Sequence, residues 1–90
     1  MQFEWDSDKN ELNKSKHGIS FEDARYVFAD PLHREFYDEQ HSIEEERWII
    51  IGNIGCIVVV VVTYRENDTV RIISARAANG CERRLYEDGE

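Results

Sequence analysis

Hydrophobic and polar residues repeat with helical spacing in the first third of the chain and with strand-like spacing in the rest. Residues 6–17 fit a polar helix whose only clearly apolar member is Leu12, and Gly18 can end it in a left-handed conformation. A second helix begins after Ser20, a good capping residue, and stops at Asp30-Pro31 because the residue before a proline avoids the helical region. Its predicted buried face comprises Phe21, Ala24, Val27 and Phe28.

The later part of the chain predicts a sheet followed by a helix. Residues 57–62 are apolar without alternation, which is typical of a central strand covered on both faces. A closing helix is predicted from Asn79, which forms a capping-box pattern with Glu82. After a short strand-like opening at 3–5, strands are predicted at 34–37, 47–54, 56–65 and 69–75.

These elements predict a single α+β domain over residues 1–90, with two N-terminal helices, an antiparallel sheet of three or four strands and a C-terminal helix. The first residues become acidic at once, unlike a signal peptide. The longest apolar region is interrupted by glycines and is shorter than the about 20 residues that cross a bilayer. We therefore expect a cytoplasmic protein. Cys56 and Cys81 lack zinc or disulfide spacing and are expected to be reduced packing residues.

The formal charge of −8 is unevenly distributed along the chain. Residues 1–46 carry 13 acids against 5 bases, whereas residues 47–90 carry 6 of each. An acidic half predicts a basic partner. The same charge argues against broad nucleic-acid binding through net charge, but a local basic site is compatible with it.

The three histidines are candidates for chemistry. His17, at the end of the first helix, has two readings: a favourable partner for the helix dipole, or a general acid or base or phosphate contact. His33 and His41 stand alone in loop-like or edge positions. No spacing places two histidines on one face with a carboxylate, so no metal site is predicted.

Arginines accumulate in the second half of the chain. Between residues 65 and 84 there are five bases and three acids. Arginines at strand ends can be solvated edge residues or ion-pair partners, or they can form a phosphodiester site, since a guanidinium donates in a fork to phosphate oxygens. The acidic run that ends at Glu46 is either a solvated loop or the source of a carboxylate that orients an arginine or acts as a base. The five bases are Arg65, Arg71, Arg76, Arg83 and Arg84.

The order and spacing of several motifs resemble those of the BrnT family of type II toxin-antitoxin toxins. The motifs are FEWD at 3–6, Asn13 followed by KHGISFE at 16–22, VFADP at 27–31, His41-Ser42 followed by EERW at 45–48, RIISAR at 71–76, and Glu82-Arg83 followed by Tyr86-Glu87. The resemblance covers almost the whole chain. It implies a RelE-like α+β fold and a ribonuclease that arrests translation without a metal or other cofactor. It also implies neutralisation by a BrnA-like ribbon-helix-helix antitoxin in a heterotetramer, with DNA contacted only through the antitoxin.

In RelE-like ribonucleases the RNA 2′-hydroxyl attacks the adjacent phosphate, which requires a base, a cation and an acid. By resemblance, His17 is expected to act as acid or base, with Tyr86 as its possible replacement, and Glu46 as base or arginine orienter. The phosphate is expected to contact Arg65 and Arg76. The remaining expected contacts are Arg83 as an additional clamp and Lys9, Lys16 and Arg71 on the RNA backbone. The rival interpretation is a non-catalytic acidic module that binds a basic DNA-binding partner; a metal-dependent nuclease has little support.

Overall fold

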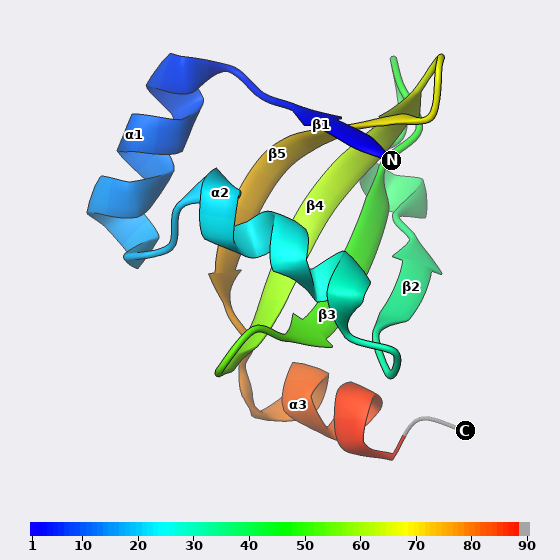
Figure 1. Ribbon diagram of the computed structural model, residues 1–90. Coiled ribbons are helices and arrows are strands. Elements are labelled where there is room, and N and C mark those ends of the chain that lie inside the picture. The colour runs from blue at the N-terminus through cyan, green and yellow to red at the C-terminus, as the bar shows by residue number, and fades with distance from the viewer. Residues whose placement is uncertain (89–90) are drawn as a thin grey trace.

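Five strands form one mixed sheet in the order β1-β5-β4-β3-β2 in the computed structural model, which describes residues 1–88 (Figure 1). β1 lies parallel to β5, and the other neighbours are antiparallel. The expected antiparallel sheet of three or four strands is therefore wrong in one respect: the N-terminal segment adds a parallel fifth strand. The strands are β1 (Gln2–Glu4), β2 (Arg34–Tyr37), β3 (Trp48–Asn53), β4 (Ile57–Arg65) and β5 (Thr69–Ala77).

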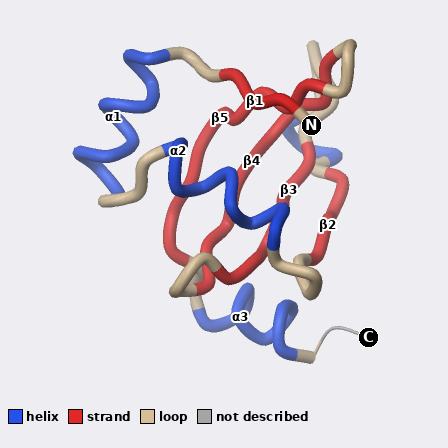
Figure 2. The backbone as a smooth tube through the Cα atoms, viewed as in Figure 1, coloured by secondary structure: helices blue, strands red, loops and turns tan. Residues whose placement is uncertain are grey.

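The helices are unevenly distributed around the sheet, as Figures 1 and 2 show. The second N-terminal helix lies over one face and the first lies beside the sheet edge at β5, whereas the C-terminal helix lies across the end of the sheet where β3 ends. The predicted second helix is one α-helical turn that continues directly into a 3-10 helix, and it ends at Ala29 as the following Asp30-Pro31 predicts. The elements are α1 (Ser7–His17), α2 (Phe21–Ala24), η1 (Arg25–Ala29), η2 (Glu39–His41) and α3 (Gly80–Glu87).

α1 is attached to the rest of the domain by amide side chains. Asn13 donates through Nδ2 to the backbone oxygens of Ile19 (2.9 Å) and Ala75 (2.7 Å), and its Oδ1 accepts from the Ala75 amide. Asn10 accepts from the Phe21 amide at 2.8 Å. Both asparagines are buried, whereas Leu12 is 68% exposed. A helix without an apolar stripe is thus held by satisfied buried hydrogen bonds.

The core lies between the helices and β4. Val58, Val60 and Val62 are buried on the face that α2 and η1 cover, where they pack with the predicted residues Phe21 and Val27. Val59 is also buried, although it points to the opposite face. The prediction of a central strand covered on both faces is therefore confirmed for this part of β4.

α3 is fixed to the sheet by polar contacts. Its predicted capping box is confirmed: the Asn79 side chain accepts from the Glu82 amide, and Glu82 accepts from the Asn79 amide. Tyr86 donates its hydroxyl to Asp30 at 2.6 Å, and this bond raises the pKa of Tyr86, so the phenol gives up its proton less readily. The same bond connects α3 to the turn after Ala29. Within residues 1–88, none of the helices has the length and apolar character of a membrane span.

Candidate active site

The sheet face opposite α2 carries a row of arginines. Along β4, Val59, Thr63 and Arg65 alternate to this face, and residues paired across strands share a face. On β5, Arg71 is paired with Thr63 and Arg76 is paired with Val59. Val59 is also paired with Ile51 of β3, which in turn is paired with Arg34 of β2. We call this surface the arginine face; its members are Arg34, Arg65, Arg71 and Arg76.

The two ends of the arginine face differ in how strongly their guanidinium groups are engaged. At the α3 end, Arg76 forms two hydrogen bonds with Glu82, at 2.7 and 2.6 Å, and Arg34 donates to the Leu85 carbonyl oxygen at 2.7 Å. The hydrogen bond from Arg76 holds the pKa of Glu82 below its ordinary value. These arginines are committed to holding α3.

At the other end, Arg65 and Arg71 share one carboxylate, Glu4 of β1. Arg71 Nη1 lies 3.1 Å from Glu4 Oε2, and Arg65 Nε lies 3.7 Å from the same oxygen. The Arg65 side chain is 51% exposed. Two guanidinium groups share one carboxylate here, so part of their donors stays available to a phosphate. Three further glutamates lie close to Arg65, namely Glu45, Glu46 and Glu66.

A hollow of ≈530 Å³ opens beside Arg65, and we call it the Arg65 hollow. Glu46 lines it, so the structure brings Arg65 and Glu46 together. Arg76 is opposite Val59, six residues from Arg65 along β4, or about 20 Å of extended chain. One phosphate group cannot contact both arginines as they stand. Arg83 lies farther away, exposed on α3.

Lys9, Lys16 and His17 lie together, as their helical spacing predicts, in a separate hollow of ≈210 Å³ between α1 and β5. Ser74 lines the same hollow, whereas Arg65 and Glu46 do not. The structure therefore brings the predicted RNA-backbone lysines to His17 but does not bring His17 to the Arg65 hollow.

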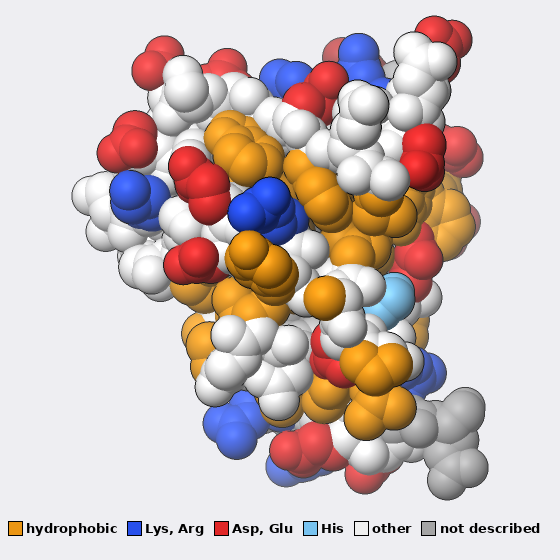
Figure 3. All heavy atoms as spheres, viewed as in Figure 1, with side chains coloured by type: hydrophobic (Ala, Val, Ile, Leu, Met, Phe, Trp, Pro, Cys, Tyr) orange, Lys and Arg blue, Asp and Glu red, His pale blue; other side chains and the backbone are white. Residues whose placement is uncertain are grey.

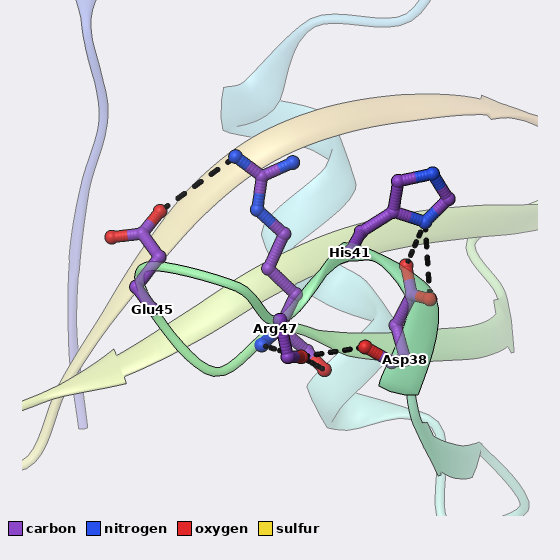
Figure 4. Close-up of polar contacts among 5 residues, drawn as sticks. Asp38, His41, Glu45 and Arg47 are labelled. Atoms are coloured by element: carbon purple, nitrogen blue, oxygen red, sulfur yellow. Dashed lines mark hydrogen bonds and ion pairs between the residues drawn. The ribbon is translucent and has the colours of Figure 1, made fainter.

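A further hollow of ≈630 Å³, the His41 hollow, adjoins the Arg65 hollow, because Glu45 lines both. In it the imidazole of His41 lies 2.9 and 3.1 Å from the two carboxylate oxygens of Asp38 (Figure 4). The remaining lining residues are Gln40, Ile43, Glu44 and Arg47.

His41 and Arg47 belong to the motifs of the family resemblance, but sequence reasoning missed the pairing of His41 with Asp38. The signal was present: Asp38 precedes His41 by three residues, and the acidic run leads directly to Arg47. A spacing of three brings the two side chains together only because η2 forms a helical turn at Glu39–His41. The loop-like sequence of this segment does not predict that turn.

The opposite, helix-bearing face has a different character (Figure 3). Met1, Phe3, Tyr26 and Phe28 line a shallow hollow there, and its arginine, Arg25, lies against the Tyr26 ring. Hydrophobic side chains gather over this face in Figure 3. A polyanion therefore finds its grouped guanidinium donors on the arginine face.

Residues 1–88 contain no group of three or more His, Cys, Asp and Glu side chains arranged to hold a metal ion. Cys56 and Cys81 are free thiols, as predicted, but both are exposed. Their predicted packing role is therefore wrong: Cys56 follows Gly55 in the turn between β3 and β4, and Cys81 lies in the first turn of α3.

Comparisons with known proteins agree with the resemblance found in the sequence. The 1.1 Å crystal structure of the Brucella abortus ribonuclease toxin BrnT has the same fold, with a TM-score of 0.70 and 24% sequence identity over 88% of this chain and 97% of that chain. A comparison with curated proteins gave no match. Residues 5–82 match the family described as the ribonuclease toxin BrnT of type II toxin-antitoxin systems. The chain therefore belongs to the BrnT family of ribonuclease toxins.

Proposed function

We propose that this chain is an endoribonuclease that inhibits translation and that binds the scissile phosphate at the open end of the arginine face. The observation that carries this proposal is the arrangement of Arg65 and Arg71 on the single carboxylate of Glu4. Guanidinium groups that are fixed but incompletely engaged can stabilise the negative charge that grows on a phosphate during cleavage. BrnT-family membership supports RNA as the substrate.

In the proposed reaction the 2′-hydroxyl of RNA attacks the adjacent phosphorus. Arg65 stabilises the charged phosphorane, and Arg71 holds the RNA backbone beside it. Glu46 lines the same hollow and acts as base or as an orienter of Arg65. The step needs positioned charge and proton transfer, both of which side chains supply, so we propose that it is metal-independent.

The other candidate residues are assigned according to their positions. Lys9 and Lys16 bind the RNA backbone beside the β5 edge, and His17, which shares their hollow, stays a candidate acid or base. Arg76 reaches a phosphate only if it leaves Glu82, so it contributes chiefly through its position beside α3. Arg83, exposed on α3, is a candidate clamp for a more distant phosphate.

The family implies an antitoxin partner, and we propose one of BrnA-like, ribbon-helix-helix type that forms a heterotetramer and carries the DNA contacts. The net charge of −8 favours a basic partner. Co-expression with such an antitoxin should relieve toxicity. In the alternative, a non-catalytic acidic module, the chain binds this partner equally well but leaves RNA intact.

Substitution of Arg65 by Ala is the direct test. We expect the cleavage rate of a purified RNA to fall about 10²- to 10³-fold, because one preorganised donor to the transition state is lost. Arg25→Ala, at an exposed arginine on the helix-bearing face, is the matched control and should retain the rate of the unmodified chain. Full growth arrest and RNA cleavage by Arg65→Ala would overturn the site, and intact RNA with the unmodified chain would overturn the function.

A further inference from the structure

We infer that His41, oriented by Asp38, is the general base of the cleavage reaction and that Arg47 binds the scissile phosphate beside it. This inference rests on the proposed ribonuclease function and assigns the proton transfer to a residue outside the predicted set. Three features carry it: the hydrogen bonding of the imidazole, the state of the Arg47 guanidinium, and the closure of the loop that holds both.

The Asp38 carboxylate determines which imidazole nitrogen is free. Both of its oxygens lie within hydrogen-bond distance of His41 Nδ1. A carboxylate accepts and cannot donate, so Nδ1 carries the proton and, in the neutral ring, Nε2 presents a lone pair. No residue among 1–88 forms a hydrogen bond with Nε2, and the His41 side chain is 64% exposed. An oriented imidazole with an accessible lone pair is the arrangement that a general base requires.

The asymmetry of exposure within this pair also fits a catalytic role. The Asp38 side chain is only 13% exposed, so the carboxylate is shielded while the imidazole that it orients reaches solvent. In a solvated surface ion pair, both partners are commonly exposed and their geometry is loosely held. Here the shielded carboxylate orients the exposed imidazole.

Arg47 differs from the other arginines of residues 1–88 in having a buried guanidinium nitrogen without a hydrogen-bond partner. That nitrogen is Nε, and Arg47 Nη2 lies 3.8 Å from Glu45. Arg76, in contrast, makes two bonds of 2.6 and 2.7 Å with Glu82. Buried polar atoms are rarely left unpaired, so the Arg47 guanidinium donors that lack a hydrogen-bond partner point to an anionic ligand.

The loop that carries these residues is closed by hydrogen bonds at its base. The Asp38 amide donates to the Arg47 carbonyl oxygen at 2.9 Å, and the Arg47 amide donates to Ser42 Oγ at 2.9 Å. The Ser42 hydroxyl donates in turn to the Asp38 carbonyl oxygen. Asp38 and Arg47, nine residues apart in sequence, are therefore neighbours, and Figure 4 shows the Arg47 side chain extending between Glu45 and the His41–Asp38 pair.

His41 Nε2 takes the proton of the RNA 2′-hydroxyl while the 2′-oxygen forms a bond to phosphorus. The bond from phosphorus to the 5′-oxygen of the next nucleotide then breaks. That 5′-oxygen takes a proton from a water molecule, and the His41 imidazolium returns its proton to the hydroxide so formed. The products are a 2′,3′-cyclic phosphate and a 5′-hydroxyl, and the electrostatic role falls to Arg47 and, across Glu45, to Arg65.

Substitution of His41 by Ala, followed by addition of imidazole, tests the assignment. On an RNA oligonucleotide that the unmodified chain cleaves, His41→Ala should be about 10²- to 10⁴-fold slower, which is the range of general base catalysis. Imidazole in the buffer should restore part of the lost rate to His41→Ala but not to Arg47→Ala. A residue that only supports the fold would not be rescued in this way.

The positioning role of Asp38 is tested by a double substitution. Asp38→Asn should slow cleavage in the unmodified background and have no further effect in His41→Ala, because the carboxylate acts through the imidazole. Glu39→Gln, adjacent in sequence and exposed, is the matched control and should keep the original rate. The Asp38, His41 and Glu39 variants should bind the same oligonucleotide with a 2′-deoxy cleavage site, which verifies that they fold.

The outcomes separate this inference from the proposed function. Full cleavage by His41→Ala, or a slowed variant that imidazole does not rescue although it binds the deoxy oligonucleotide, would overturn the His41 assignment and leave the ribonuclease function standing. Loss of activity in His17→Ala alone would assign the base to the α1 hollow instead. If the unmodified chain cleaves no RNA, both proposals fail.

Discussion

Single buried hydrogen-bonding side chains decide how the most polar helix attaches to the domain. Asn13→Ala should lower the free energy of unfolding by about 3 kcal/mol, because it leaves the buried amide and carbonyl groups of Ala75 without their partner. Urea unfolding monitored by circular dichroism measures this change.

Leu12→Ala is the natural comparison, since it removes more hydrophobic surface from the same helix. Leu12 is 68% exposed, so its substitution should change the free energy of unfolding by less than about 0.5 kcal/mol. If the Leu12 variant proved the less stable of the two, the attachment of α1 by asparagine side chains would be refuted.

At this scale the sequence predicted apolar contacts better than polar ones. Phe21, Ala24 and Val27 are buried as their helical spacing predicts. No sequence pattern predicts the burial of Asn13, because an asparagine side chain is also stable when it is exposed to water. Only the position of the Ala75 backbone makes its burial favourable. The pairing of Asp38 with His41 was missed for the same reason: the turn that joins them is set by its surroundings.

At the scale of elements, α3 depends on an ionised carboxylate. The Arg76 hydrogen bond lowers the pKa of Glu82, and this effect outweighs the burial that would raise it. A carboxyl group with a lowered folded pKa stabilises the protein fully above its unfolded pKa, and that contribution is lost as the pH falls through the folded value.

Glu82→Gln tests this dependence, because glutamine can keep the capping box but not the charge. The variant should be less stable than the unmodified chain at pH 7, and the difference should shrink as the pH falls through the lowered pKa of Glu82. Urea unfolding across this range gives the measurement, with Glu87→Gln on the exposed side of α3 as control. A difference that is independent of pH would contradict the role of the ion pair.

Structural features that are determined by neighbouring residues were predicted more accurately than those that depend on residues distant in the sequence. Gly18 and the Asn79–Glu82 box cap their helices as predicted, since capping is decided within one helical turn. The parallel pairing of β1 with β5 joins Gln2 to Thr69 across most of the chain, and no local pattern predicts it. The sheet was consequently expected to have too few strands.

At the scale of the whole molecule, an acidic protein gathers several arginines on one face of its sheet. The net charge of −8 coexists with the arginine face, whose open end gathers Arg65 and Arg71 next to the His41 hollow. The uneven charge along the sequence predicted that such a site was possible. It could not predict that Arg76 and Arg34 are committed to α3, because those contacts exist only after the chain has folded.

The most direct test of this account is cleavage of an RNA oligonucleotide in the presence of a chelator such as EDTA, with the products identified by mass spectrometry. We expect a 2′,3′-cyclic phosphate and a 5′-hydroxyl at the cleaved bond, and no cleavage when that position carries a 2′-deoxy sugar. Intact RNA, or cleavage that persists at the 2′-deoxy position, would contradict it.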